Sequence, residues 1–154
     1  MRPVVRDDAD ELIRLDGFIK TLDGNIAVLA SSYTINPDIL ANIGPSLNPL
    51  APLSDSVKIM WLPAVDSRDG LPYGIAGAEY IIVASPVQTH LSPGDQRAVT
   101  VPAEMLMGGT GFSSAFEKMG EEFTLNGGVK VYVYRRTRAN TEEEMAEVWE
   151  RIKK

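Results

Sequence analysis

The sequence predicts an α/β fold in which a mostly parallel β-sheet lies between layers of helices. Two short, unbroken apolar runs, 26–30 and 78–84, are typical of strands that are buried on both faces. Segments with apolar residues at helical spacing precede and follow these runs. A pair of strands near the end of the chain adds an antiparallel hairpin to the sheet.

The first part of the chain predicts a helix, a buried strand and a short second helix. Apolar residues recur at helical spacing over 7–22, and acidic residues gather at the front, where the helix dipole favours them. Asp23-Gly24-Asn25 ends this helix, and the strand 26–30 follows. Asn36-Pro37 is typical of a helix start, and we expect that helix to end at Gly44-Pro45.

The middle of the chain alternates between strands and turns. We expect strands at 57–62 and 78–84, separated by a polar turn at 66–72. A further short strand is expected at 97–101, followed by helical pieces at 102–107 and 112–119. Four residues, Gly108-Gly109-Thr110-Gly111, separate these two helical pieces.

The end of the chain predicts a hairpin and a terminal helix. Strands at 121–125 and 129–134 flank Asn126-Gly127-Gly128, and Thr141 with Glu144 forms a capping box that opens a helix over 141–152. Together these elements predict one domain spanning 1–154, with an N-terminal helix at 7–22 and a core at 25–138. We interpret this domain as a Rossmann-like three-layer sandwich with a C-terminal antiparallel hairpin and a terminal helix.

Charge and composition disfavour several classes of function. The formal net charge is −6, which repels a nucleic-acid backbone, and we interpret Arg135, Arg136 and Arg138 as the solvated end of a strand. The chain has no cysteine and one histidine, so we expect no thiolate or His-rich metal site. The glycines at 108–111 follow a helical piece and lack a phosphate-loop lysine. We therefore expect no nucleotide and no other cofactor and assign no metal; an oxygen-rich calcium site formed by Asp66, Asp69 and the Asn36-Pro37-Asp38 segment stays open as an alternative.

Polar residues follow the predicted parallel strands, at the edge where ligands of such sheets bind. We expect loops at this edge to form a polar cleft suited to hydroxylated sugars. The candidate binding residues are Ser31, Ser32, Asp66, Arg68, Asp69, Gln88, His90, Asp95 and Gln96.

Catalytic interpretations of these residues are less favoured. His90 lies five residues from both Ser85 and Asp95, but no Gly-x-Ser-x-Gly nucleophile elbow is present, so a turn role is favoured. Asp66 and Asp69 are typical of turn residues rather than of a paired glycosidase site. Two tyrosines, at 132 and 134, share a face of the hairpin and can stack on a sugar, although packing against the Trp149 helix is favoured. We expect no catalytic residue in this chain.

Three stretches carry a resemblance to a known family: DSRDGLP at 66–72, AEYIIVASPVQTHLSPGDQRAVTVPAEML at 78–106 and EEFTLNGGVKVYVYRR at 121–136. With Ser31-Ser32 and Asn36-Pro37-Asp38, the similarity covers 25–138. The chain resembles the tail that follows the last membrane helix in bacterial glycosyltransferases of the protein-mannosyltransferase superfamily, which includes the aminoarabinose-transferase-like enzymes.

The resemblance implies a location and a role. Members of that superfamily transfer a sugar from a polyprenyl-phosphate donor at the outer face of the membrane. Their catalytic acidic residue lies in an extracytoplasmic loop near the start of the membrane portion, outside the region of similarity. We therefore expect a non-catalytic accessory domain at the extracytoplasmic face of the cell membrane. Its partners would be the membrane-embedded part of the parent enzyme and a glycan or protein acceptor. The alternatives are a stand-alone cytosolic hydrolase or transferase that uses His90 with Asp95, and a docking domain without a ligand.

Overall fold

The computed structural model describes residues 8–32, 34–37, 39–40, 58–60, 74–89, 96–109 and 111–153. The described strands form one five-stranded sheet in the order β2-β1-β3-β5-β4. Their bounds are β1 Asn25–Leu29, β2 Lys58–Met60, β3 Tyr80–Ser85, β4 Phe116–Leu125 and β5 Val129–Arg136. The fold is thus α/β, as the sequence predicts.

The sheet is mixed, so the expectation of a mostly parallel sheet is wrong. Strand β1 pairs in parallel with β2 and β3, whereas β5 pairs antiparallel with both β3 and β4. The hairpin accounts for the difference, because β4 begins at Phe116 rather than at residue 121 and β5 extends to Arg136. The hairpin of β4 and β5 pairs directly with β3, so two of the four described strand pairings, β3–β5 and β4–β5, are antiparallel.

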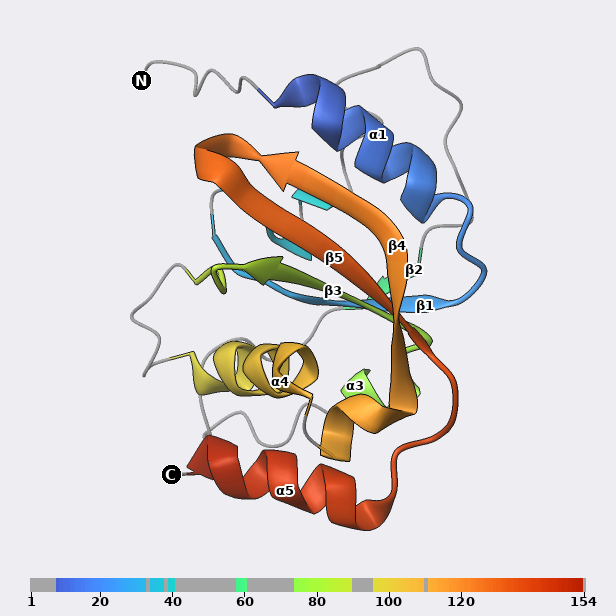
Figure 1. Ribbon diagram of the computed structural model, residues 1–154, viewed down its shortest axis with the longest axis vertical. Helices are drawn as coiled ribbons and strands as arrows, with labels where there is room; N and C mark the ends of the chain where they lie inside the picture. Colours follow the sequence, from blue (N-terminus) through green and yellow to red (C-terminus); the bar gives the residue numbers. More distant parts are fainter. Residues whose placement is uncertain are drawn as a thin grey trace.

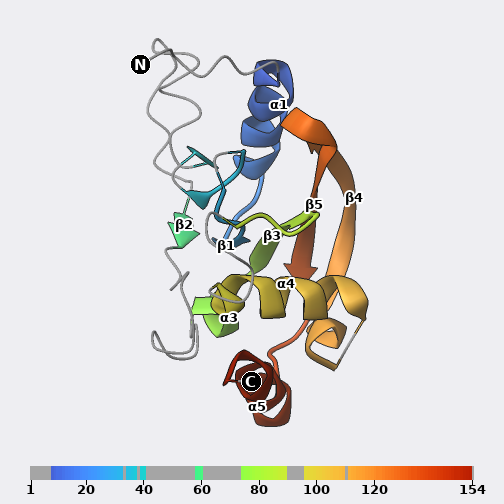
Figure 2. The ribbon, with the colours of Figure 1, turned by 90° about the vertical axis from the view of Figure 1, so that its left-hand side faces the viewer.

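Helices cover both faces of this sheet (Figure 1). Helix α1 (Ala9–Ile19) lies on one face, and α3 (Gly74–Gly77) and α4 (Arg97–Gly108) lie on the other. Helix α5 (Glu142–Lys153) packs beyond α4, against α4 and the 3-10 turn η3 (Gly111–Ala115), as the side view in Figure 2 shows. No helix in the described ranges is long and apolar enough to span a bilayer.

The alternation of buried side chains along β1 explains why both faces are covered. Ile26 and Val28 belong to the cluster beneath α1, whereas Ala27 and Leu29 belong to the cluster on the α4 side. Because successive side chains of a strand point to opposite faces, an unbroken apolar run requires apolar cover on both. The interpretation of 26–30 as a doubly buried strand is therefore confirmed.

Two predicted elements between 97 and 119 are wrong. The segment 97–101 forms the first turns of α4, not a strand, and its β-branched residues Val99 and Thr100 are buried on the helix. The predicted helix 112–119 is η3 followed by the start of β4. Tertiary packing overrides local strand propensity in the first case, and a β-bulge between Lys118 and Glu122 interrupts the strand alternation in the second.

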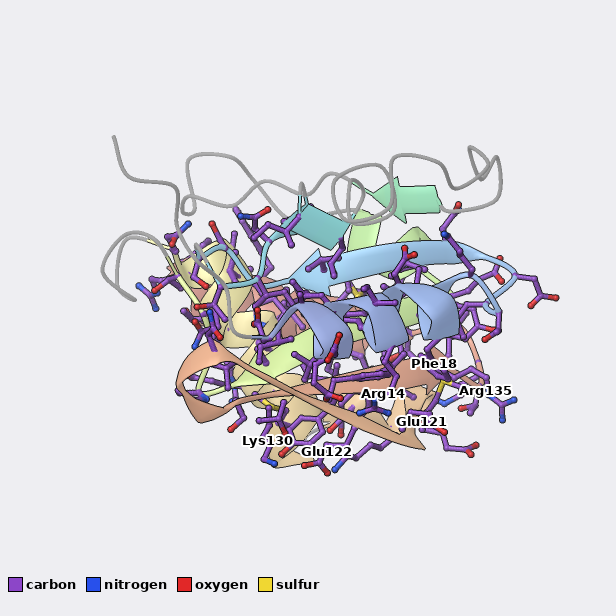
Figure 3. All side chains as sticks on the ribbon, turned by 90° about the horizontal axis from the view of Figure 1, so that it is seen from above. Arg14, Phe18, Glu121, Glu122, Lys130 and Arg135 are labelled. Atoms are coloured by element: carbon purple, nitrogen blue, oxygen red, sulfur yellow. The ribbon has the colours of Figure 1, made fainter. Side chains whose placement is uncertain are left out.

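Helix α1 is tied to the edge strand β4 by three side chains at successive turns. Asp8 Oδ2 accepts a hydrogen bond from the Asn126 N–H at 2.9 Å, and Glu11 Oε2 accepts one from the Thr124 N–H at 3.0 Å. Arg14 Nη2 donates to the Glu122 carbonyl at 2.6 Å. Figure 3 shows Arg14 beside Glu121 and Glu122 of the strand. These bonds satisfy main-chain groups of Glu122 and Thr124 in β4 and of Asn126 directly after it.

Candidate functional site

Four of the nine predicted binding residues lie together at the carboxyl ends of β1 and β3. The Ser31 N–H donates to the Gln88 carbonyl at 2.8 Å, which joins the two loops that follow these strands. Ser32 Oγ donates to Gln88 Oε1 at 2.9 Å, and Gln96 Nε2 donates to Ser31 Oγ at 3.3 Å. Residues 65 positions apart in sequence thus share one network of hydroxyl and amide groups.

Two side chains in the described part of the loop after β1, Ser32 and Asn36, hydrogen-bond its main chain. Ser32 Oγ accepts hydrogen bonds from the Thr34 and Ile35 N–H groups at 3.1 and 3.3 Å. Asn36 Nδ2 donates to the Ser32 carbonyl, while Asn36 Oδ1 accepts from the Ile39 N–H at 2.9 Å. Serine and asparagine stabilise turns and helix starts in this way. The predicted cap at Asn36 is confirmed, and it fixes the position of Ser32.

Gln96 is the buried member of this network. Its side chain is fully buried, and its carbonyl accepts the first main-chain bonds of α4 from Val99 and Thr100. A buried amide requires hydrogen-bond partners, and Ser31 is one of them. Gln96 therefore positions Ser31, while Ser31, Ser32 and Gln88 are partly exposed.

The remaining candidates lie outside the described residues: Asp66, Arg68, Asp69, His90 and Asp95. The cleft that they were expected to complete, and the alternative of an enzyme using His90 with Asp95, stay predictions. Within the described residues no group of three or more His, Asp or Glu side chains is suitably placed to hold a metal ion.

The two tyrosines of the hairpin are half-buried and pack against the core on the side of α5, as favoured from the sequence. Tyr132 and Tyr134 pack against the same cluster as Trp149 of α5. Lys118 Nζ lies 4.0 Å from the centroid of the Tyr132 ring, where its charge interacts with the aromatic face. Lys118 thus covers a face of the Tyr132 ring on which a sugar would stack.

A pocket of about 450 Å³ lies at the opposite edge of the sheet, where β1 and β3 begin and β5 ends. Its lining includes the three arginines at 135, 136 and 138, together with Asp23 and Glu79. In Figure 1 this edge lies on the right-hand side, away from the loops that follow β1 and β3. Sequence reasoning missed the pocket because its lining comes from three segments that are distant in the chain. In the sequence, the cluster of basic residues Arg135-Arg136-Thr137-Arg138 is the one local pattern that marks this pocket.

Arg136 is a fixed element of this edge, not a solvated strand end. Its guanidinium donates to the carbonyls of Ala78 and Ile75, both at 2.7 Å, and to Asn140 Oδ1 at 2.8 Å. It also lies 4.4 Å from the centroid of the Phe116 ring. Partial burial lowers the pKa of Arg136 below its usual value. The side chain joins β5 to α3 and to the loop before α5.

Arg138 is neutralised by a carboxylate. Its two Nη atoms bond both carboxylate oxygens of Glu144, at 2.9 and 2.7 Å. The Arg138 bonds, followed by the bonds from Thr141 N–H, Asn140 and Ser114, lower the pKa of Glu144 to about 2. Glu144 N–H donates to Thr141 Oγ1 at 3.1 Å, which confirms the predicted capping box.

Comparison with known proteins finds no matching family model, no similar curated protein and no similar solved structure.

Proposed function

We propose that this chain is a non-catalytic glycan-recognition domain of a membrane glycosyltransferase that uses a polyprenyl-phosphate sugar. The observation that carries the binding role is the network of Ser31, Ser32, Gln88 and Gln96 at the carboxyl ends of two parallel strands. Neutral hydroxyl and amide groups exchange hydrogen bonds with sugar hydroxyls without the desolvation cost of a charge. Hydrogen bonds from the Thr34 and Ile35 N–H groups hold the Ser32 hydroxyl in place, so little ordering of this group is needed when a ligand binds.

The parent enzyme and the location rest on the sequence resemblance over 25–138. On this proposal the domain lies at the extracytoplasmic face, contacts the membrane-embedded part of the enzyme and holds a glycan or protein acceptor. The parallel strands β2-β1-β3, with helices on both faces, support a Rossmann-like three-layer architecture for it. In such sheets ligands bind beyond the carboxyl ends of the strands, where the serine–glutamine network lies.

The binding role is tested by titrating isotope-labelled protein with oligosaccharides and following amide resonances. We expect saturable shifts at residues 31, 32 and 88, with millimolar affinity. Gln88→Ala should abolish them, because it removes the side-chain amide and keeps the main-chain bond to Ser31. Thr21→Ala, which deletes an exposed hydroxyl at the other edge, is the matched control. Unmoved resonances, or shifts that survive Gln88→Ala, would refute the role.

The genomic reading frame tests the parent enzyme separately. A continuous upstream frame that encodes several apolar helices supports a membrane glycosyltransferase. A ribosome site directly before the Met1 codon instead supports the stand-alone enzyme that uses His90 with Asp95, and turnover by the purified chain would establish that alternative.

A further inference from the structure

The pocket at the amino ends of β1 and β3 contains opposite charges that do not pair with each other. Asp23 and Glu79 provide carboxylates, and Arg135 and Arg136 provide guanidinium groups. Across the described part of the chain, the Asp23 and Glu79 side chains form no ion pair or hydrogen bond. Opposite charges that share a pocket but stay apart produce a local field that favours a dipolar ligand.

Arg135 and Arg136 differ in how free their donors are to bond a ligand. Arg136 is held by carbonyl and amide oxygens, so it retains its positive charge in a fixed position. Arg135 pairs with Glu117 at 3.2 Å, but both side chains are more than half exposed, at 52% and 60%. An exposed pair of this kind is weak and exchanges partners readily. Arg135 is therefore able to turn its donors to an anionic group in the pocket.

The backbone at Gly24 makes room for the acidic side of the pocket. A Cβ atom at Gly24 would overlap the carboxylate of Glu79, which rests over this residue. Glu79 is also held through its main chain, because its N–H donates to Asn25 and its carbonyl accepts from Arg136. The glycine thus allows the Glu79 carboxylate to lie against the turn between α1 and β1, and Asp23 of the same turn also lines the pocket.

We propose that this pocket binds a small zwitterion, with an ammonium group at Asp23 and Glu79 and a carboxylate or similar anion at Arg135. The volume of about 450 Å³ is in the range of small-molecule sites. Arg136 stays with its carbonyl and amide oxygens and Arg138 stays with Glu144, so neither side chain bonds the ligand. The site is independent of the serine–glutamine network, which lies at the other edge of the sheet.

The probes are β-alanine and γ-aminobutyrate, compared with butyrate and butylammonium, which each carry one of the two charges. We expect saturable amide shifts at residues 80, 137 and 139 with at least one of the zwitterions. Each single-charge probe should bind about two- to fivefold more weakly, the loss expected for one exposed ion pair. Shifts with neither zwitterion, or equal affinity for butyrate alone, would overturn the proposal.

Two charge-neutral variants locate the two ends of the ligand. Glu79→Gln should weaken zwitterion binding about two- to fivefold and leave butyrate binding unchanged. Arg135→Gln should weaken zwitterion binding to the same extent and leave butylammonium binding unchanged. Both side chains are exposed, so both variants should fold. Glu104→Gln, an exposed acid on α4, is the matched control. Gly24→Ala should act like Glu79→Gln by displacing the carboxylate. If Glu79→Gln binds the zwitterion as tightly as the original chain, the proposal is wrong.

Discussion

Helices α1 and α5 lie on opposite sides of the sheet, and each uses a glutamate–arginine pair in a different way. Glu11 bonds Arg14 of its own helix and reaches the Thr124 N–H of β4, so it joins the helix to the sheet. Glu144 bonds Arg138 of the preceding loop and the Thr141 N–H that opens its own helix. The same chemistry thus serves tertiary attachment in α1 and helix initiation in α5. The attachment of α5 to the rest of the molecule depends on packing and on two further bonds: Arg97 Nη2 donates to the Arg151 carbonyl at 2.6 Å, and Ser114 Oγ donates to Glu144 Oε2 at 3.1 Å.

The largest effect should come from removing core contacts of α1. Leu15 is completely buried, and Leu15→Ala should destabilise the protein by about 2–5 kcal/mol. Ile13→Ala on the same helix, at a half-exposed position, should cost less than about 0.5 kcal/mol. Urea unfolding of both variants measures the difference. Equal small effects would mean that the polar contacts, not the apolar face, hold α1 in place.

The next effect concerns the attachment of α3 and of the loop before α5. Arg136→Lys removes the planar fork that donates to Ala78, Ile75 and Asn140, and it should cost about 2–3 kcal/mol because carbonyls lose their donors. Arg135→Lys, one position earlier and more than half exposed, is the control and should be nearly neutral. Thermal unfolding distinguishes the two, and similar melting temperatures would contradict the structural role of Arg136.

A smaller effect should follow when helix initiation alone is weakened. Thr141→Ala removes the acceptor for the Glu144 N–H, and it should cost about 1 kcal/mol. Because the bond is local, fraying should be confined to the start of α5. Amide hydrogen exchange tests this, and faster exchange in α1 as well would show that the two helices are coupled.

The smallest effect is the pH dependence that both glutamates confer. The pKa of Glu11 and that of Glu144 are each lowered to about 2 from the ordinary 4.5, chiefly by the arginine hydrogen bonds. Folding favours the ionised carboxyls, so their contribution is complete above pH 4.5 and is lost as the pH falls towards 2. Salt should weaken the Glu11 contribution more, because that side chain is 35% exposed and Glu144 only 12%. Carboxyl resonances that titrate near 4.5 would contradict both assignments.

Local signals predicted most of the fold that is described. The apolar stripe of α1, the doubly buried β1, the hairpin and the Thr141–Glu144 box are encoded within short segments, and each is present. The start of α4 was missed because its β-branched residues face the core, where packing outweighs propensity. The start of β4 was missed because it is a charged edge strand with a bulge.

One of the two candidate sites could be predicted from the sequence and the other could not. Ser31, Ser32, Gln88 and Gln96 were predicted together because residues that follow parallel strands meet at one edge. The pocket at the other edge depends on how far β5 extends and on where Asp23 and Glu79 lie relative to it. Those relations arise from strand register, which no local pattern in this sequence specifies.

The bonds from α1 to β4 have a consequence for solubility. An edge strand with open main-chain groups is a template for pairing with another molecule. Asp8, Glu11 and Arg14 occupy such groups between Glu122 and Asn126. Removing α1 should therefore promote self-association through β4 even where the remaining sheet stays folded, and sedimentation of a chain shortened to begin at residue 23 would reveal it. The first helix is, in this sense, the molecule's own protection against aggregation.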